Sequence, residues 1–457
     1  MKILLISANV ATTPYPVYPL GLSMVAQALR TAGHEVRQYD FLYKGSSLEE
    51  LAATVEQYGP GLIGISIRNI DNVNLLSEQR YLDVVRSLVQ RIKQRTETPV
   101  VLGGSGFSMM PEAILKFLGA DYGIAGEAEA AMVEFAEAAA RGIYPQERCW
   151  RTTPQLRGLG IPSASYEPEL MEFYLKRGHI AGVQTKRGCA HRCVYCSYPF
   201  LEGREIRCRD PKAVVADIQA LVNTHGAQYI FFTDSLFNDD EGHFMEVVRE
   251  MKRQGVKVPW TAFFKPEGLT DENLAVMKET GLSAAEMGSD ATTDTTLRGL
   301  GKTFSIEDVI RCHQLLQKHE ISAIYYYMFG GPGETEETVR EGIKNILSLE
   351  NAISFIFMGI RILPGTPLYS IAQKEGLVVE GQDLLEPAYY LAPGIDRKWL
   401  ERTLTDAFAG IRRCVFPPDA MDSSLQFLHS MGHSGMLWEM MSRKGRKRKG
   451  PDLHAAA

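Results

Sequence analysis

The sequence predicts an α/β protein in which two parallel-sheet units follow one another and a small helical C-terminal region comes last. Three observations support this fold class. Short apolar runs alternate with helical patterns through two long stretches, a proline-rich segment separates them, and three cysteines follow a strand-like run in the second stretch. Because strand–helix alternation with short connections produces parallel sheets, we expect a doubly wound, Rossmann-like sheet first and a partial (β/α)6 barrel of the TIM type second.

The chain has 457 residues, of which 45% are hydrophobic and 23% are charged, as in ordinary globular proteins. Its net charge of −6 does not favour a nucleic-acid partner, and seven cysteines are too few for a disulfide scaffold. The N-terminal apolar run is shorter than a signal-peptide core, and no run reaches the ~20 residues that a membrane span needs. We therefore expect a cytoplasmic protein without a membrane span.

The first unit, residues 1–142, is predicted from apolar runs bounded by helix signals. Gly33 ends the first helical pattern, Ser47 with Glu50 three residues later fits a capping box, and Pro111 starts a helix. The expected strands are Lys2–Ser7, Val36–Phe41, Leu62–Ile67, Pro99–Leu102 and Tyr122–Ala125. The expected helices are Leu20–Ala32, Ser47–Tyr58, Tyr81–Arg95 and Pro111–Leu118.

Prolines break the pattern in residues 143–176, which we expect to be a linker, and the alternation resumes in the second unit, residues 177–375. Its expected strands are Ile180–Thr185, Tyr229–Thr233, Trp260–Phe264, Ala284–Gly288, Ala323–Phe329 and Phe355–Ile362. Its expected helices include Pro211–Asn223, Glu241–Gln254, Asp271–Thr280 and Thr335–Leu349. Residues 376–442 are predicted to be helical, most clearly at Trp399–Cys414.

The end of the chain, residues 443–457, begins with a run in which six of seven residues are Lys or Arg. Blocks of like charge are usually solvated and disordered, and this is what we expect of the tail. The alternative is that the basic run contacts nucleic acid or anionic lipid.

Three cysteines lie in one loop, at Cys189, Cys193 and Cys196, directly after a predicted strand. A parallel barrel has its binding loops at this end of its strands. A [4Fe–4S] cluster normally takes four cysteines, so three leave one iron open to another ligand. One alternative is a zinc site that includes His191, although zinc usually draws a second ligand pair from elsewhere and none is evident. The other alternative is packing of the thiols without a metal.

The spacing Cys189-x3-Cys193-x2-Cys196, with an aromatic residue before the last cysteine, resembles the signature of the radical S-adenosylmethionine (SAM) superfamily. The resemblance implies that the open iron chelates SAM and that reduction of the cluster cleaves SAM to a 5′-deoxyadenosyl radical. In such enzymes the cofactors carry the one-electron chemistry, and the protein binds, orients and shields them. It also implies that Tyr195 lies near the adenine and that a donor such as flavodoxin or ferredoxin supplies the electron.

Four later strand ends carry loops in the order found in the same superfamily: Thr233–Asn238, Glu286–Asp290, Phe329–Thr335 and Arg361–Pro367. Besides Tyr195, the resemblance implies SAM contacts at Asp234, Glu286, Ser289, Gly330, Gly331 and Arg361. One departure is that Ser289 is followed by Asp290, where relatives often carry a Glu-Ser pair. No side chain is assigned a catalytic role.

The first unit resembles the cobalamin-binding domain that precedes the barrel in one branch of this superfamily. The stretches that carry the resemblance are Tyr18–Gly21, Ala32–Val36, Gly64–Asn69, Gly103–Gly104 and Gly126–Glu127. It implies cobalamin contacts at Tyr18, Leu20, Gly21, Ser66, Arg68, Asn69, Gly103, Gly104, Gly126 and Glu127. For Arg68 and Asn69 the alternative is that they fix their loop through ordinary hydrogen bonds.

The loop after the first strand, residues 8–21, lacks the histidine that ligates cobalt in cobalamin mutases and methionine synthase-type domains. The domain's one histidine, His34, is expected to be structural. If cobalamin binds here, a histidine of this loop does not hold its lower face.

Together the resemblances imply a cobalamin-dependent radical SAM enzyme that methylates an unactivated carbon of a small-molecule or natural-product substrate. The alternatives are a rearrangement, cyclisation or aminocarboxypropyl transfer with a vestigial corrin domain, and a non-catalytic cobalamin or iron–sulfur sensor. The sequence does not identify the substrate. Aromatic residues near the barrel mouth are candidates for contacting it, and strand alternation sends only some of them inward. They are Tyr325, Tyr326, Tyr327 and Phe329.

Overall fold

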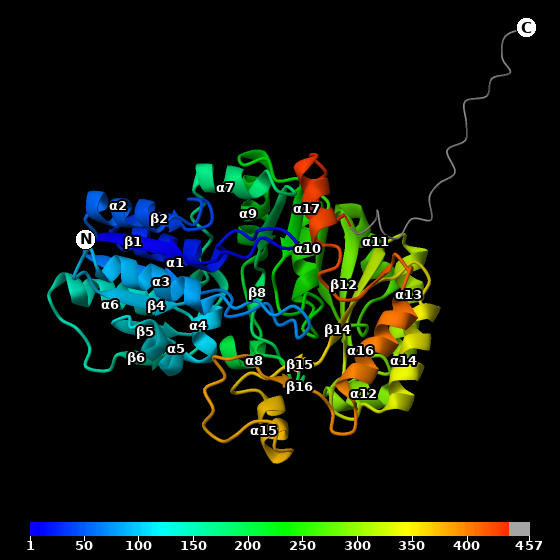
Figure 1. Cartoon of the computed structure of the whole chain (residues 1–457). Helices are drawn as coiled ribbons and strands as arrows, with labels where there is room; N and C mark the ends of the chain where they lie inside the picture. The colour runs from blue at the N-terminus through cyan, green and yellow to red at the C-terminus, as the bar shows by residue number, and fades with distance from the viewer. Residues whose placement is uncertain (438–457) are drawn as a thin grey trace, which may run out of the picture.

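The computed structural model describes residues 1–437 (Figure 1). The predicted basic tail, residues 443–457, and the end of the predicted helical region lie outside the described residues. Two α/β bodies lie side by side, the first coloured blue to cyan, and the later helices α15, α16 and α17 lie against the second (Figure 1). The predicted fold class, two parallel-sheet domains in series, is confirmed.

The first domain contains a six-stranded parallel sheet in the order β2-β1-β3-β4-β5-β6. Its strands are β1 (Lys2–Ser7), β2 (Glu35–Asp40), β3 (Leu62–Ser66), β4 (Val100–Gly103), β5 (Tyr122–Ala125) and β6 (Cys149–Arg151). The last strand lies within the predicted linker. It pairs with β5, and its Trp150 stacks on Phe135 with 6.0 Å between the ring centroids. The linker prediction was therefore wrong at this point, because apolar packing extends the sheet by one strand.

Helices cover both faces of the first sheet. They are α1 (Leu20–Thr31), α2 (Leu48–Tyr58), α3 (Leu82–Lys93), α4 (Ser105–Met109), α5 (Pro111–Leu118) and α6 (Glu129–Ala140). α1 and α6 pack together on one face, and α2, α3 and α5 cover the other. The Ser47 hydroxyl accepts a hydrogen bond from the Glu50 amide at 3.2 Å, as its predicted capping role requires.

The second domain contains a seven-stranded parallel sheet in the order β7-β10-β11-β12-β13-β14-β17. Its strands are β7 (Ile180–Val183), β10 (Tyr229–Phe232), β11 (Trp260–Phe264), β12 (Leu282–Asp290), β13 (Ser322–Phe329), β14 (Ile353–Met358) and β17 (Cys414–Val415). The first six follow the predicted runs. The seventh comes from the predicted helical region, because α16 (Arg397–Phe408) ends before Gly410, whose φ of 75° is left-handed.

Strand alternation divides this sheet into a helix-covered outer face and an inner face. The outer helices are α9 (Pro211–Asn223), α10 (His243–Arg253), α11 (Asp271–Thr280), α12 (Asp294–Gly299), α13 (Ile306–Lys318) and α14 (Glu336–Ser348). Tyr325, Tyr327 and Phe329 pack in the core that contains these helices, whereas Tyr326 belongs to an inner cluster. Ile180 and Val415, from the two edge strands, join the same inner cluster. The sheet therefore curls into an open barrel, and of the four predicted aromatic residues only Tyr326 faces its interior.

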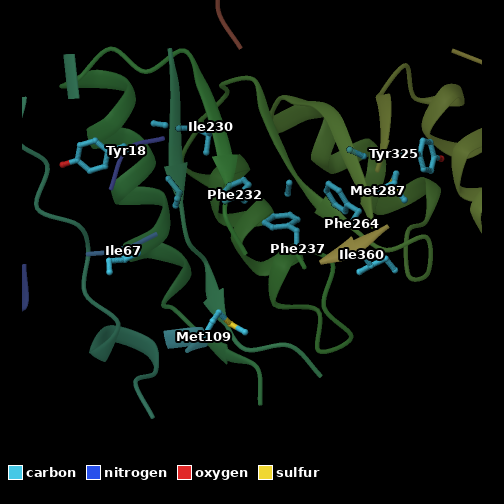
Figure 2. Close-up of a cluster of buried hydrophobic side chains, with 14 of the residues drawn as sticks. Tyr18, Ile67, Met109, Ile230, Phe232, Phe237, Phe264, Met287, Tyr325 and Ile360 are labelled. Carbon is cyan, nitrogen blue, oxygen red and sulfur yellow. The ribbon is translucent and has the colours of Figure 1, made fainter. Parts of the chain in front are cut away.

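One of the buried apolar clusters extends through both domains. Figure 2 shows Ile67 and Met109 of the first domain and Phe232 and Phe264 of the barrel as members of one buried cluster. Shared burial of this kind removes apolar surface of both domains from water at once. The two sheets are therefore parts of one packed unit.

Two loops of the first domain reach the second domain. The loop after β1, residues 9–19, meets α17 (Asp422–Ser430), where Nε2 of Gln426 donates to the Thr12 carbonyl at 3.4 Å. The loop after β3, residues 68–81, reaches the two-stranded sheet β15 (Ile360–Arg361) and β16 (Tyr389–Tyr390).

The second loop is held by an ion pair between Asp71 and Arg361, with Nε and Oδ2 2.8 Å apart and both side chains at most 3% exposed. Arg361 also donates to the carbonyls of Ile362 and Leu384, at 2.7 and 2.8 Å. This predicted SAM contact is thus engaged in the domain interface.

The remaining elements are short. They are a 3-10 turn (Gly158–Gly160), α7 (Pro168–Leu175), β8 (Lys186–Arg187), α8 (Tyr198–Leu201), β9 (Arg207–Cys208) and α15 (Pro367–Lys374). Among residues 1–437, no helix is both long enough and apolar enough to cross a membrane.

Replacing Asp71 by Asn should leave the Arg361 guanidinium buried without a counter-ion. Breaking a buried pair costs about 3–5 kcal/mol, so we expect a clearly lower urea midpoint of unfolding. The matched control is Glu386→Gln, which removes the exposed partner of Arg80 in the same interface and should cost at most about 1 kcal/mol. Equal midpoints for the two variants would contradict the structural role of the buried pair.

Candidate functional site

A cavity of about 580 Å³ opens between the carboxyl edge of the first sheet and the barrel. Ligands of open α/β sheets bind at this edge. All ten residues predicted to contact cobalamin line the cavity. Its wall on the barrel side includes Gln184, Ser197 and Tyr198, which flank the cysteine loop in the sequence, and Thr233 at the end of β10. The structure therefore places the predicted cobalamin residues and the residues next to the cysteine loop around the same cavity.

Backbone forms the floor of the cavity where β4 and β5 end. Gly104 has a φ of 98°, and a Cβ there would lie 2.6 Å from the Ile67 carbonyl oxygen. Gly126 has a φ of 93°, and a Cβ would lie 2.7 Å from Oγ1 of Thr152. Both positions require glycine. The lining also includes the apolar residues Leu5, Gly64, Val101, Ile124 and Met132. A floor of glycines and an apolar lining allow the close approach of a large ligand such as a corrin.

Arg68 and Asn69 follow the end of β3 and line the cavity. Neither side chain makes a hydrogen bond to another residue in the part of the chain that the structure describes. The loop is instead held by backbone, since the Arg68 carbonyl accepts from Oγ of Ser105 at 3.1 Å. The alternative role of fixing the loop therefore finds no support among residues 1–437, and both side chains are suitably placed to meet a ligand.

Glu127 belongs to a buried group of charges that crosses the domain boundary. Its carboxylate lies 3.5 Å from Nη1 of Arg187 and 2.5 Å from Nη2 of Arg207, and Glu129 lies 2.6 Å from Nη2 of Arg187. Burial opposes ionisation of Glu127, but the two arginines hold its pKa below the ordinary value. Two carboxylates of the first domain are thus paired with two guanidinium groups beside the cysteine loop.

The cysteine loop is anchored by backbone hydrogen bonds at three points. The Cys189 amide donates to the Gly203 carbonyl at 3.1 Å, and the Val194 amide to the Leu300 carbonyl at 3.0 Å. The Val194 carbonyl accepts from the Leu368 amide at 2.8 Å. These contacts hold the three thiols on one short, fixed segment.

The environment of the thiols suits a cluster that binds them as thiolates. Burial raises the pKa of Cys193, and it raises that of Cys196 to about 12. A metal centre must therefore displace the protons when it binds. In residues 1–437 no three His, Cys, Asp or Glu side chains converge closely enough for a single metal ion.

Lys302 lies beside the cysteine loop and was not predicted from the sequence. Its ammonium donates to the Gly288 carbonyl at 2.8 Å, lies 3.2 Å from the Tyr195 hydroxyl, and pairs with the Asp290 carboxylate. Burial opposes the charge, but Asp290 and the nearby Cys193 raise the pKa of Lys302 above its ordinary value. A buried ion pair, Lys302 with Asp290, therefore stands beside the cysteine loop.

Asp234, predicted to contact SAM, is engaged within the protein. Its carboxylate accepts from the Thr185 amide at 2.7 Å and the Thr185 hydroxyl at 2.5 Å, and it lies 3.3 Å from Nζ of Lys186. Nζ of Lys186 is also 3.1 Å from Asp239. These contacts tie the start of the cysteine loop to the end of β10. Asp234, like Arg361, therefore binds other residues of the chain and stabilises the fold.

The other predicted SAM residues differ in position. Gly330 and Gly331 form a tight turn, where the Gly330 amide donates to the Glu334 carboxyl at 3.2 Å and burial raises the pKa of Glu334 to about 7. The Ser289 hydroxyl is fully buried with no hydrogen-bond partner among the described residues. Glu286 faces the barrel interior, where it accepts from the Tyr326 hydroxyl at 2.5 Å.

Two family models match the chain, and each falls on one sheet. The B12 binding domain matches residues 6–136, and the radical SAM superfamily matches residues 183–346. These spans contain the cavity-lining loops of the first domain and the cysteine loop of the second.

Similar proteins extend over most of the chain. The tryptophan 2-C-methyltransferase of Streptomyces laurentii is 24% identical, over 76% of this chain and 71% of that protein. An uncharacterised methyltransferase of Pyrococcus horikoshii is 25% identical, over 79% and 80%.

Among solved structures, the radical SAM methyltransferase TsrM from Kitasatospora setae, with cobalamin and a [4Fe–4S] cluster bound, has a TM-score of 0.85 at 23% identity. That likeness covers 96% of this chain and 97% of that one. The cobalamin-dependent enzyme OxsB has a TM-score of 0.70 at 14% identity, over 96% and 71%. Since both family models match, the predicted resemblance is confirmed: the chain combines a B12-binding domain with a domain of the radical SAM superfamily.

Proposed function

We propose that this enzyme transfers a methyl group from SAM, by way of cobalamin, to a carbon atom of a small-molecule substrate. One observation carries the proposal: a single cavity is bounded by the predicted cobalamin residues on one side and by residues that flank the cysteine loop on the other. Methyl transfer between these cofactors requires them to share such a space. The names of the relatives, a tryptophan methyltransferase among them, support methylation as the reaction.

When bound, the [4Fe–4S] cluster would supply the electron, SAM would supply the methyl group and the 5′-deoxyadenosyl radical, and cobalamin would carry the methyl group. Cys189, Cys193 and Cys196 would hold the cluster. Lys302, paired with Asp290, would hold the Tyr195 ring in place beside the cysteine loop. The glycine floor and Arg68 would meet the corrin. The chain's own part is to bind, orient and exclude water.

The partner and compartment follow from this chemistry as predictions. A low-potential donor of the flavodoxin or ferredoxin type would reduce the cluster, and the reducing cytoplasm would keep the thiols available for iron. The acidic net charge of −6 continues to argue against a nucleic-acid substrate.

The cluster assignment predicts which cysteines matter for iron. Cys193→Ala should lose iron after anaerobic reconstitution, because a thiolate ligand is missing. Cys312→Ala should retain about four irons per chain, since Cys312 is buried in α13 at 5% exposure and away from the loop. Iron analysis with electron paramagnetic resonance of the reduced protein measures both. Equal iron in the two variants would refute the assignment.

The cavity assignment predicts that a bulky side chain at Gly21 displaces cobalamin. Gly21 lines the cavity, and a Cβ there meets no atom within 4 Å, so Gly21→Phe should fill the space without straining the fold. We expect at least a tenfold loss of cobalamin occupancy, measured from the visible spectrum after gel filtration. The control is Ser87→Phe on the exposed side of α3. Undiminished binding by Gly21→Phe would contradict the location.

The methyl-transfer proposal is tested without knowing the substrate. Reduced, reconstituted enzyme is given SAM, and S-adenosylhomocysteine is quantified with and without bound cobalamin. We expect about one S-adenosylhomocysteine per cobalamin and almost none in cobalamin-free protein, because cobalamin accepts the methyl group. Formation of 5′-deoxyadenosine without cobalamin-dependent S-adenosylhomocysteine would instead support rearrangement, cyclisation or another non-methylating radical reaction.

A further inference from the structure

The edge of the barrel at which its strands begin forms a surface on the side away from the cysteine loop. That loop follows the end of β7, and in a parallel sheet the strands all begin at the opposite edge. α17 lies across this opposite edge, because its Leu425 packs in one cluster with Tyr229 and Ile353, the first residues of β10 and β14. We call this region, made of α17 and the residues just before the strands, the amino face of the barrel.

α17 carries apolar side chains on its outer side as well as on its inner side. The inner side buries Leu425 and His429, at 2% and 5% exposure. Phe427 and Met431, four positions apart at the end of the helix, are 63% and 66% exposed. Side chains at this spacing lie next to each other on a helix, so the two form one apolar pair. A surface helix usually keeps its outer side polar, and the pair is therefore suited to contact with another apolar surface.

Three exposed basic residues directly precede strands that begin at the amino face. Arg177 comes before β7, Lys257 before β11 and Arg412 before β17, and none of them forms an ion pair within residues 1–437. Two exposed carboxylates, those of Glu320 and Glu350, precede β13 and β14 on the same face. The described part of the amino face is therefore only weakly positive by itself.

The sequence adds a strong positive charge next to this face. The segment after α17 is fixed to the barrel, since the Gly435 amide donates to the Gly178 carbonyl at 2.7 Å and Met436 is 7% exposed. The described chain ends at Leu437, and the run with six Lys or Arg in residues 443–449 starts six positions later, outside the described residues. Six residues span at most about 20 Å, so the run cannot start farther than that from Leu437. An apolar pair and a dense positive charge thus belong to one side of the molecule.

We propose that the amino face binds the surface of an anionic lipid bilayer, with Phe427 and Met431 inserted among the lipids and the basic residues paired with lipid phosphates. Apolar side chains enter the boundary between headgroups and acyl chains, and nearby Lys and Arg are attracted by the negative lipids. A nucleic acid would pair with the basic residues but would leave the apolar pair in water. The cysteine loop lies at the other end of the barrel strands, so the bilayer does not cover it. The inference does not depend on the reaction that the enzyme catalyses.

The test measures how the purified full-length protein floats with lipid vesicles in a density gradient. One set of vesicles contains phosphatidylcholine alone, and the other contains equal parts of phosphatidylcholine and phosphatidylglycerol. We expect at least about tenfold stronger binding to the anionic vesicles, since each basic residue near such a surface strengthens binding about fivefold. High salt should weaken the binding, because it screens the charges. Equal binding to both sets of vesicles, or no binding to either, would overturn the proposal.

The apolar contribution is tested by replacing Phe427 and Met431 together by Ser. Both side chains are exposed, so the variant should keep the wild-type urea midpoint while its affinity for anionic vesicles falls at least about tenfold. The matched control replaces Leu377 and Val379 by Ser, which are 43% and 74% exposed in the loop after α15. α15 lies at the bottom of Figure 1 and α17 at the top, so the control should bind like the wild type. Equal affinities of the two double variants would contradict insertion of the pair.

The charges are tested by reversal and by neutralisation. Lys257→Glu combined with Arg412→Glu should lower the affinity for anionic vesicles at least about tenfold. Lys116→Glu combined with Arg141→Glu, at exposed positions of the first domain, is the matched control and should leave it unchanged. Replacing the six basic residues of the run 443–449 by Gln should have a larger effect than the reversal on the barrel. Tighter binding of single-stranded RNA than of anionic vesicles, lost in the basic variants but kept when the apolar pair is replaced, would indicate a nucleic-acid partner and overturn the proposal.

Discussion

The ion group of Arg187, Arg207, Glu127 and Glu129 is the interaction on which the functional geometry depends. Each of its side chains is at most 8% exposed, and the group joins the loop after β5 to the segment that leads into the first cysteine. Removing one partner of a buried ion pair leaves an uncompensated charge, which costs several kcal/mol. The cluster loop therefore cannot move away from the cavity floor without exposing or orphaning these charges.

Other interactions in the interface also hold the two domains in a fixed position. A common apolar core and the Asp71–Arg361 pair hold the two sheets at other points. An enzyme in which two large cofactors exchange a one-carbon group needs a fixed distance between them. A small misplacement of the reacting groups lowers the reaction rate strongly. The protein meets that need with non-directional packing over a wide area and directional charge pairs at the site itself.

The sequence predicted both sheets, because apolar periodicity is a local signal, and it predicted the cluster, because its ligands lie within eight residues. It also predicted the ten cavity residues, which follow the strands of one sheet. It missed β6 and β17, whose two or three residues carry too little periodicity. It did not identify Lys302 or the partners of Asp234 and Arg361, since these contacts join residues up to 290 positions apart. The basic pair before Cys189 was the one available hint of the ion group.

The loop after β1, residues 9–19, belongs to the first domain but contacts the interior of the second. It has no histidine, and its Tyr15 packs against the inner apolar cluster of the barrel. A segment of the first domain is therefore part of the interior of the second. Replacing the N-terminal domain of this chain by that of a relative would also replace part of the barrel interior, so the two domains are not independent modules.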